Sequence, residues 1–181
     1  FRDGKYRNIN VRVGELPVDE VEQIEEESPQ KPTYPHGIRL GELDKDQADY
    51  KNTIFHRVIK GFMAQTGDVK FGKMQAFNPE LVGRGGSSLP DLPSEFSDIA
   101  FVTGTVGMAR SNNPNSANSQ FFICFQPAPF LDRQYTVFGK VVEGMDTINK
   151  IKACKTGSQL GHQDVPEEDV LISSVKRIEE A

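Results

Sequence analysis

The sequence has few of the residues that build disulfide frameworks or metal centres. Its 181 residues include no tryptophan, two cysteines (Cys124 and Cys154) and three histidines. Two cysteines are too few for a disulfide framework, so we expect free thiols and a reducing compartment. His36, His56 and His162 lie far apart and lack ligand spacing, so we expect no metal site.

Long apolar runs and excess positive charge are also missing. No apolar stretch approaches the roughly 20 residues that span a bilayer, so we expect no membrane insertion. The formal net charge is -5, which argues against nucleic acid as the main partner, because phosphate contacts need a basic face. The length suits one domain with a full core and is short for two.

The stretch from residue 55 to 68 reads as two short strands that meet at Lys60-Gly61. Side chains of an extended strand alternate between its two faces. A cation, an amide and a thioether would then line a single surface. We expect one side of the first strand to carry Phe55, Arg57 and Ile59, and one side of the second to carry Met63 and Gln65.

A second strand pattern covers residues 119–125. Period-two alternation predicts a core face made of Phe121, Ile123 and Phe125. Gln120 and Phe122 would lie on the opposite face. By the same alternation His56 is opposite to Arg57 in its strand, so we expect a packed structural histidine.

Together these stretches resemble the cyclophilins, which are peptidyl-prolyl cis-trans isomerases. The resemblance runs from about Tyr50 to the C-terminus, and residues 108–119 are similar to the bacterial branch of the family. Several motifs in the same order make a chance match very unlikely. The matching motifs are FHRVI (55–59), GFMAQTGD (61–68), GTVGMA (104–109), NSQFFI (118–123) and VFGKV (137–141).

The expected fold is mainly β. Many short strands with few helices suggest a closed antiparallel barrel. The resemblance implies eight strands capped by two helices. The segment from Met145 to Ala153 has the apolar spacing of one helix, and residues 169–178 have the apolar content of a closing strand.

The resemblance implies an isomerase that acts on X-Pro bonds of peptides and unfolded proteins and assists folding. Rotation about the X-Pro amide bond has a barrier of about 18 to 20 kcal/mol, because resonance of the nitrogen lone pair gives the bond double-bond character. A hydrogen-bond donor that draws the nitrogen out of this resonance therefore speeds rotation. A guanidinium suits this task, and no covalent intermediate, metal or cofactor is required. The implied catalytic residues are Arg57, Phe62 and Gln65; the implied substrate-binding residues are Met63, Ala109, Arg110, Gln120, Phe122, Phe130, Leu131 and Tyr135.

Two positions depart from the pattern of many family members. Phe130 stands where many carry tryptophan, and Tyr135 stands where many carry histidine. The indole N–H donor is therefore lost at the first position. The glycine-rich run 83–88 lacks the Gly-Lys-Ser/Thr ending of a phosphate loop, so we expect no nucleotide there. The resemblance implies that this loop borders the peptide groove.

Residues 1–49 read as a divergent segment, ahead of an isomerase domain at 50–181. We expect a short strand within 8–16, a short acidic helix within 19–27 and an irregular, proline-containing insertion at 29–49. The apolar positions are too sparse to offset about 1 to 2 kcal/mol of backbone ordering per residue. The segment should therefore dock on the barrel or on a partner protein, and the alternative function is an accessory subunit of a larger assembly.

The sequence begins with Phe1 rather than methionine. One interpretation is a removed leader, which predicts the mitochondrial matrix or another organelle. The alternative is the bacterial cytoplasm, with the true N-terminus missing from the sequence.

Overall fold

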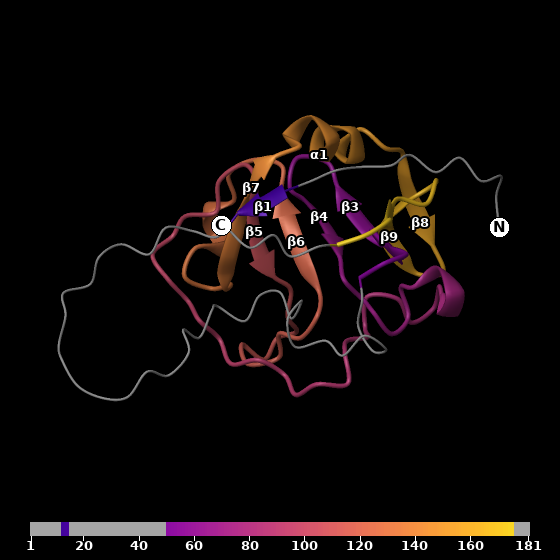
Figure 1. The fold of residues 1–181 in the computed structure, drawn as a ribbon, viewed down its shortest axis with the longest axis horizontal. Coiled ribbons are helices and arrows are strands. Elements are labelled where there is room, and N and C mark those ends of the chain that lie inside the picture. Colours follow the sequence, from indigo (N-terminus) through magenta and orange to yellow (C-terminus); the bar gives the residue numbers. More distant parts are fainter. Residues whose placement is uncertain (1–11, 15–49, 176–181) are drawn as a thin grey trace.

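The computed structural model describes residues 12–14 and 50–175, and its core is a six-stranded antiparallel sheet (Figure 1). The strand order is β1-β7-β5-β6-β4-β3. Its strands are β1 (Arg12–Gly14), β3 (Arg57–Ile59), β4 (Met63–Thr66), β5 (Thr105–Met108), β6 (Phe121–Cys124) and β7 (Val137–Glu143).

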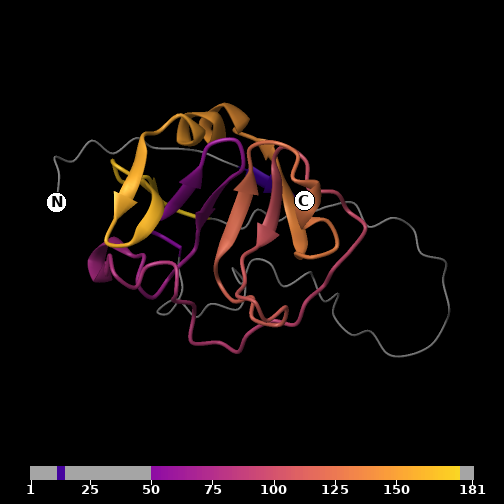
Figure 2. The same ribbon diagram turned by 180° about the vertical axis from the view of Figure 1, so that it is seen from behind.

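Four further strands form two antiparallel pairs. β2 (Thr53–Ile54) pairs with β10 (Leu171–Ile172), and β8 (Thr156–Gln159) pairs with β9 (His162–Pro166). Two views from opposite sides agree that the β8–β9 hairpin lies beside β3 at one edge of the sheet (Figures 1 and 2). Two short 3-10 turns, η2 (Met74–Ala76) and η3 (Pro129–Leu131), lie in the connecting loops.

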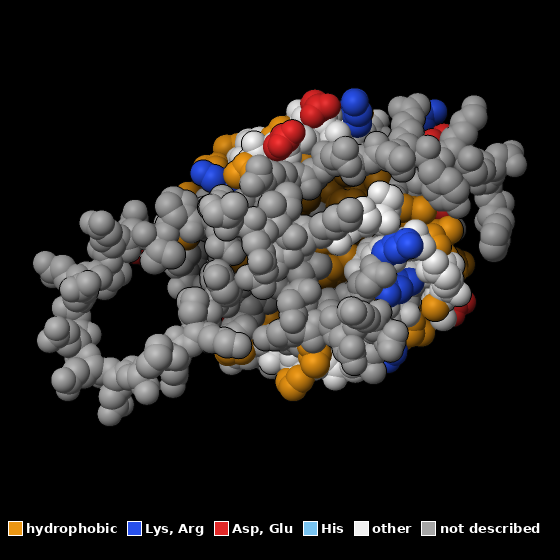
Figure 3. Space-filling model, in the orientation of Figure 1, with side chains coloured by type: hydrophobic (Ala, Val, Ile, Leu, Met, Phe, Trp, Pro, Cys, Tyr) orange, Lys and Arg blue, Asp and Glu red, His pale blue; other side chains and the backbone are white. Residues whose placement is uncertain are grey.

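The helix α1 (Met145–Lys152) crosses one end of the sheet (Figure 2). Ile148 and Ile151 are spaced for one helical face, and both are buried in the main core. Asp146 in the first turn and Lys150 in the last turn carry charges that interact favourably with the helix dipole. The outer surface over this helix carries charged side chains of both signs (Figure 3).

The two faces of the sheet bury different clusters. Val58, Ala64, Ile123 and Val106 are paired across four neighbouring strands and face the main core beneath α1. This arrangement confirms the predicted core face of residues 119–125. The cluster on the opposite face consists of Met63, Phe101, Phe122, Cys124, Ala128, Leu131 and Val137.

Phe55 corrects the predicted alternation. It packs in the main core with Val58, whereas Ile59 packs against the cluster on the opposite face. Residues 55 and 56 lie between β2 and β3 and belong to neither strand, and the N–H of Phe55 donates to the carbonyl oxygen of Val170. Alternation holds only along a continuous strand, so it could not place Phe55 relative to Arg57.

The expected closed barrel is not present in the described residues. The hydrogen-bonded ladders end at β1 and β3, because β2 and β10 pair with each other instead of extending the main sheet. This part of the chain contains one α-helix, α1, of the two that the resemblance implies. β1 confirms a short strand within residues 8–16, and the expected helix at 19–27 and the insertion at 29–49 lie outside the described residues.

Candidate active site

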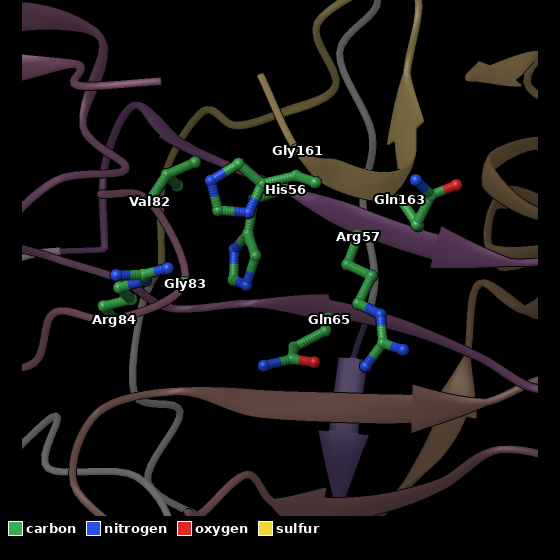
Figure 4. Close-up of a pocket in the computed structure, with 9 residues that line it drawn as sticks. His56, Arg57, Gln65, Val82, Gly83, Arg84, Gly161 and Gln163 are labelled. Atoms are coloured by element: carbon green, nitrogen blue, oxygen red, sulfur yellow. The ribbon is translucent and has the colours of Figure 1, made fainter. Parts of the chain in front are cut away.

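A row of directly paired residues crosses the face of the sheet opposite the main core. Arg57 pairs with Gln65, Gln65 pairs with Phe122, and Phe122 pairs with Gly107. Side chains of directly opposed residues project to the same face, so a guanidinium, an amide and a phenyl ring become neighbours. Arg57 and Gln65 extend side by side from adjacent strands (Figure 4). The predicted shared surface is confirmed for these residues and for Met63.

The turn between β3 and β4 sets this register. Gly61 adopts a φ of +76°, a conformation that side-chain-bearing residues rarely adopt. The N–H of Phe62 donates to the carbonyl oxygen of Ile59 at 3.0 Å and closes the turn. Arg57 is therefore held opposite Gln65 by a tight hairpin that the sequence indicates at Lys60-Gly61.

Aromatic rings form the apolar part of the site. Phe122 is 5% exposed, and its ring stacks on Phe101 with centroids 5.7 Å apart. Tyr135 approaches Phe122 edge-on at 5.8 Å. Met63 and Leu131 belong to the same cluster. The ring of Phe62 lies 5.1 Å from that of Phe130, which is 62% exposed and projects to solvent.

Gly107 makes room for these rings. A Cβ atom at this position would lie 2.7 Å from both Phe101 Cε1 and Phe122 Cζ, closer than real Cβ contacts allow. The sequence patterns did not indicate that Phe101 stacks on Phe122, because Phe101 lies outside the predicted strands. The unusual glycine inside the GTVGMA strand was the available signal, since glycine in a strand often marks a close approach.

A chain of side-chain amides connects the polar end of the site to a loop. Gln65 Nε2 donates to Gln120 Oε1 at 3.0 Å, and Gln120 Nε2 donates to the carbonyl oxygen of Gly85 at 2.8 Å. Gln120 therefore bridges β4 and the glycine-rich run 83–88. This contact places that run beside the polar end of the Arg57-Gln65-Phe122 row.

The carboxylate of Asp68 fixes the same loop. It is fully buried, and its Oδ2 accepts from the N–H groups of Gly83 at 2.8 Å and Gly85 at 3.0 Å. Its Oδ1 accepts from the N–H groups of Phe71 at 2.8 Å and Lys70 at 3.1 Å. Four donors satisfy one buried charge, as burial of a carboxylate requires. The motif GFMAQTGD contains Asp68, yet nothing in it indicated this role.

Arg110 contributes its side chain to the aromatic wall of the site. Its Cζ lies 4.4 Å from the ring centroid of Tyr135 and 6.0 Å from that of Phe96. Its guanidinium also donates to the carbonyl oxygen of Gln134 at 2.8 Å. The N–H of Ala109 donates to the carbonyl oxygen of Gln120 at 3.0 Å and is engaged within the sheet. Arg110 therefore extends the aromatic wall by stacking.

Two buried titratable groups flank the site. Burial lowers the pKa of His56 to about 4, although Asp68 acts in the opposite direction. Neither ring nitrogen of His56 has a hydrogen-bond partner within the described part of the chain. Burial also raises the pKa of the Cys124 thiol to about 12. At neutral pH both side chains are uncharged, and the fixed charge of the paired row comes from Arg57.

Residues 12–14 and 50–175 include no cluster of three or more His, Cys, Asp or Glu side chains suited to a metal ion. Within the same ranges, the helices fall short of the length and apolar character that crossing a membrane requires.

The mainly β fold and the Arg57-Gln65-Phe122 row on one sheet face define a cyclophilin-like domain. Residues 38–177 match the family model described as cyclophilin type peptidyl-prolyl cis-trans isomerase/CLD. The chain belongs to this family of isomerases.

Sequence relatives carry the same enzyme name. A probable peptidyl-prolyl cis-trans isomerase of Brucella abortus is 56% identical over 140 residues, which cover 77% of this chain and 69% of the relative. Peptidyl-prolyl cis-trans isomerase B of Escherichia coli is 42% identical over 134 residues, covering 70% and 76%. These relatives support the predicted bacterial-like branch. They do not support the mitochondrial matrix, and they favour the bacterial alternative.

A solved structure shares the fold. It is a Cryptosporidium parvum cyclophilin type peptidyl-prolyl cis-trans isomerase crystallised in the presence of the dipeptide Ala-Pro. It is 32% identical in sequence, with a TM-score of 0.58, and the match covers 69% of this chain and 73% of that one.

Proposed function

We propose that this protein catalyses cis-trans isomerisation of X-Pro bonds in peptides and unfolded proteins, and so assists folding. The observation that supports it best is the paired row of Arg57, Gln65 and Phe122. The row sets a permanent cation and an amide beside the apolar cluster that contains Met63, Phe122 and Leu131 on one face. A proline ring and its flanking peptide group need these two surfaces at adjacent positions.

In the proposed mechanism, Phe122, Met63 and Leu131 enclose the proline ring, and Phe62 closes the pocket with Phe130. Ring burial stabilises the ground state as well, so it cannot accelerate rotation by itself. Acceleration comes from Arg57, which donates to the proline nitrogen as the amide twists out of resonance. A donor of this kind contributes about 3 to 4 kcal/mol to the transition state, or two to three orders of magnitude in rate.

The remaining residues position the peptide. Gln65 uses one Nε2 hydrogen on Gln120 and keeps the second for the substrate carbonyl. Ala109 and Arg110 flank the bound peptide, and Tyr135 supports the wall between Phe122 and Arg110. Rotation about the amide needs no covalent intermediate, so none of these residues has to act as a nucleophile.

An exchange measurement on an Ala-Pro peptide tests this function. Wild type should accelerate cis-to-trans conversion, and Arg57→Ala should lower kcat/KM by at least about 100-fold. Because Arg57 is exposed, the free energy of unfolding of the Arg57→Ala variant should differ little from that of wild type. Arg133→Ala removes an exposed arginine outside the site and should match wild type. Failure of wild type to accelerate the reaction would overturn the function; an active Arg57→Ala would overturn the mechanism.

We also propose that residues 50–181 form the isomerase domain and residues 1–49 a divergent segment that docks on it or on a partner protein. Pairing of β1 with β7 supports contact between the two parts. The bacterial relatives support the bacterial cytoplasm as the compartment.

A further inference from the structure

A cavity of about 390 Å³ has Arg57 and Gln65 in its lining, and none of the Phe or Tyr rings of the site. Loop residues 82–84 form one wall, and residues 161–163 at the start of β9 form another (Figure 4). β3 is the last strand of the main sheet, and β9 packs against it. The cavity therefore lies beyond the sheet edge, next to the proposed catalytic arginine.

The charge of this cavity is unlike that of the whole chain. The chain has a net charge of -5, yet the residues that line the cavity include Arg57, Arg84 and two histidines and no acid. The ion pairs within the described residues involve other side chains, so neither guanidinium is paired with a carboxylate there. The Asp68 carboxylate behind the loop is already bound by four backbone N–H groups. Such a concave, acid-free site attracts anions.

Hydrogen bonds fix the positions of both walls of the cavity. Asp68 holds the backbone of Gly83 and Gly85 on both sides of Arg84. His162 Nε2 lies 3.1 Å from the carbonyl oxygen of Glu80 and must donate there, because a carbonyl only accepts. This hydrogen bond links β9 to the segment that leads to Arg84.

His56 adds an unsatisfied polar group to the same cavity. It is 7% exposed, and both of its ring nitrogens lack partners within the described residues. A buried donor without an acceptor is destabilising. An oxygen-bearing ligand in the cavity would offer the missing acceptor.

We propose that this cavity binds an oxyanion, a carboxylate or a phosphate, carried by the proline peptide close to the isomerised bond. Arg84 binds the anion through its planar fork, and Arg57 has five N–H donors and can serve both anion and amide. The preferred substrates are then acidic or phosphorylated proline peptides. This inference rests on the proposed function, because the anion arrives as part of its substrate.

Matched peptides test the preference. Each peptide contains one proline. Within a matched set, the peptides differ only at one position, which lies one or two residues before or after the proline and carries Glu, phosphoserine or Gln. In the full chain, kcat/KM measured by exchange NMR at low salt should be about tenfold higher for an anionic peptide than for its Gln counterpart, equivalent to about 1.4 kcal/mol. The ratio should fall with ionic strength. A ratio near one at every position would overturn the proposal.

Two variants assign the effect. Arg84→Gln should bring the anionic-to-neutral ratio close to one, and it should fold because Arg84 is exposed. Lys140→Gln removes the same charge from an exposed site on β7, outside the cavity, and should keep the ratio. A ratio that survives Arg84→Gln, or that falls equally in both variants, would overturn the assignment.

The neutral peptide separates this inference from the proposed function. If wild type fails to accelerate the Gln peptide, the isomerase function fails. The cavity is then judged by titrating inorganic phosphate and following backbone amide NMR signals. Shifts at Gly83, Arg84 and His162 that vanish in Arg84→Gln support an anion site, and their absence refutes it. If phosphate binds but the peptide ratio stays near one, the peptide-borne anion is refuted.

Discussion

Gln65 Nε2 donates to Gln120 Oε1 at 3.0 Å, and this bond fixes which end of each side-chain amide faces the other. Gln120 can accept from Gln65 because its own Nε2 is used on the carbonyl oxygen of Gly85 at 2.8 Å. One hydrogen and the oxygen of the Gln65 amide remain for a peptide and for Arg57, its partner across β3 and β4. The orientation of Gln65 therefore depends on a loop that follows it by 20 residues.

Gln120→Met should disturb this orientation without unfolding the protein. Methionine has a similar length but offers no amide acceptor, so Gln65 should lose its fixed position. We expect kcat/KM for an Ala-Pro peptide to fall by about tenfold, with a change in the free energy of unfolding below about 1 kcal/mol. Gln159→Met, at an exposed site on β8, should behave as wild type. A fully active Gln120→Met would show that Gln120 does not position Gln65.

Gly107→Ala should disrupt the proline pocket. The added methyl would lie 2.7 Å from the rings of Phe101 and Phe122, so one ring must move. Overpacking of this kind costs about 1 to 3 kcal/mol in the free energy of unfolding, and KM for the peptide should rise. Gly157→Ala is the matched control, because its nearest neighbour would be Glu167 Oε1 at 3.9 Å. Chemical denaturation gives the free energy of unfolding of both variants, and kinetics give their KM for the peptide. Equal stability of the two variants would contradict the close contact of residue 107 with Phe101 and Phe122.

Asp68→Asn should weaken the loop that carries Gly83 and Gly85. An amide replaces one acceptor oxygen with a donor, which would then face two backbone N–H groups. We expect the free energy of unfolding to drop by about 2 to 4 kcal/mol in urea titrations. Asp146→Asn removes a carboxylate from an exposed pair with Lys150 and should change stability by less than about 1 kcal/mol. Similar losses in both variants would argue against the buried anchor.

His56 should make stability depend on pH below neutrality. Burial lowers its pKa from 6.5 to about 4 in the folded state, with Arg57 and His162 acting in the same direction and Asp68 opposing them. Between pH 6.5 and 4 the unfolded chain binds the extra proton, so the free energy of unfolding falls as pH falls through this window. The loss is about 3 kcal/mol at most. His56→Gln should flatten the profile in urea titrations between pH 7 and 4, and an unchanged slope would contradict it.

Local patterns predicted the parts of the site that lie within continuous strands. Alternation within 121–125 separated Phe122 from the core face, and alternation within β4 placed Met63 with Gln65. Helical spacing predicted α1. The same rule failed for Phe55, because the chain leaves β2 before that residue and enters β3 after it. The roles of the site residues came from family motifs and stay predictions.

The sequence alone determined which side chains share a face within one strand, and that Ile148 and Ile151 share one face of a helix. The reason is that side-chain direction follows the period of the backbone. Tertiary packing decided which strands adjoin, and therefore that Arg57 meets Gln65 and Gln65 meets Phe122. It also brought Phe101 behind Phe122, and Arg84 and His162 to one cavity. These residues are far apart in the chain, and no local period relates them; burial and hydrogen bonding of the whole fold bring them together.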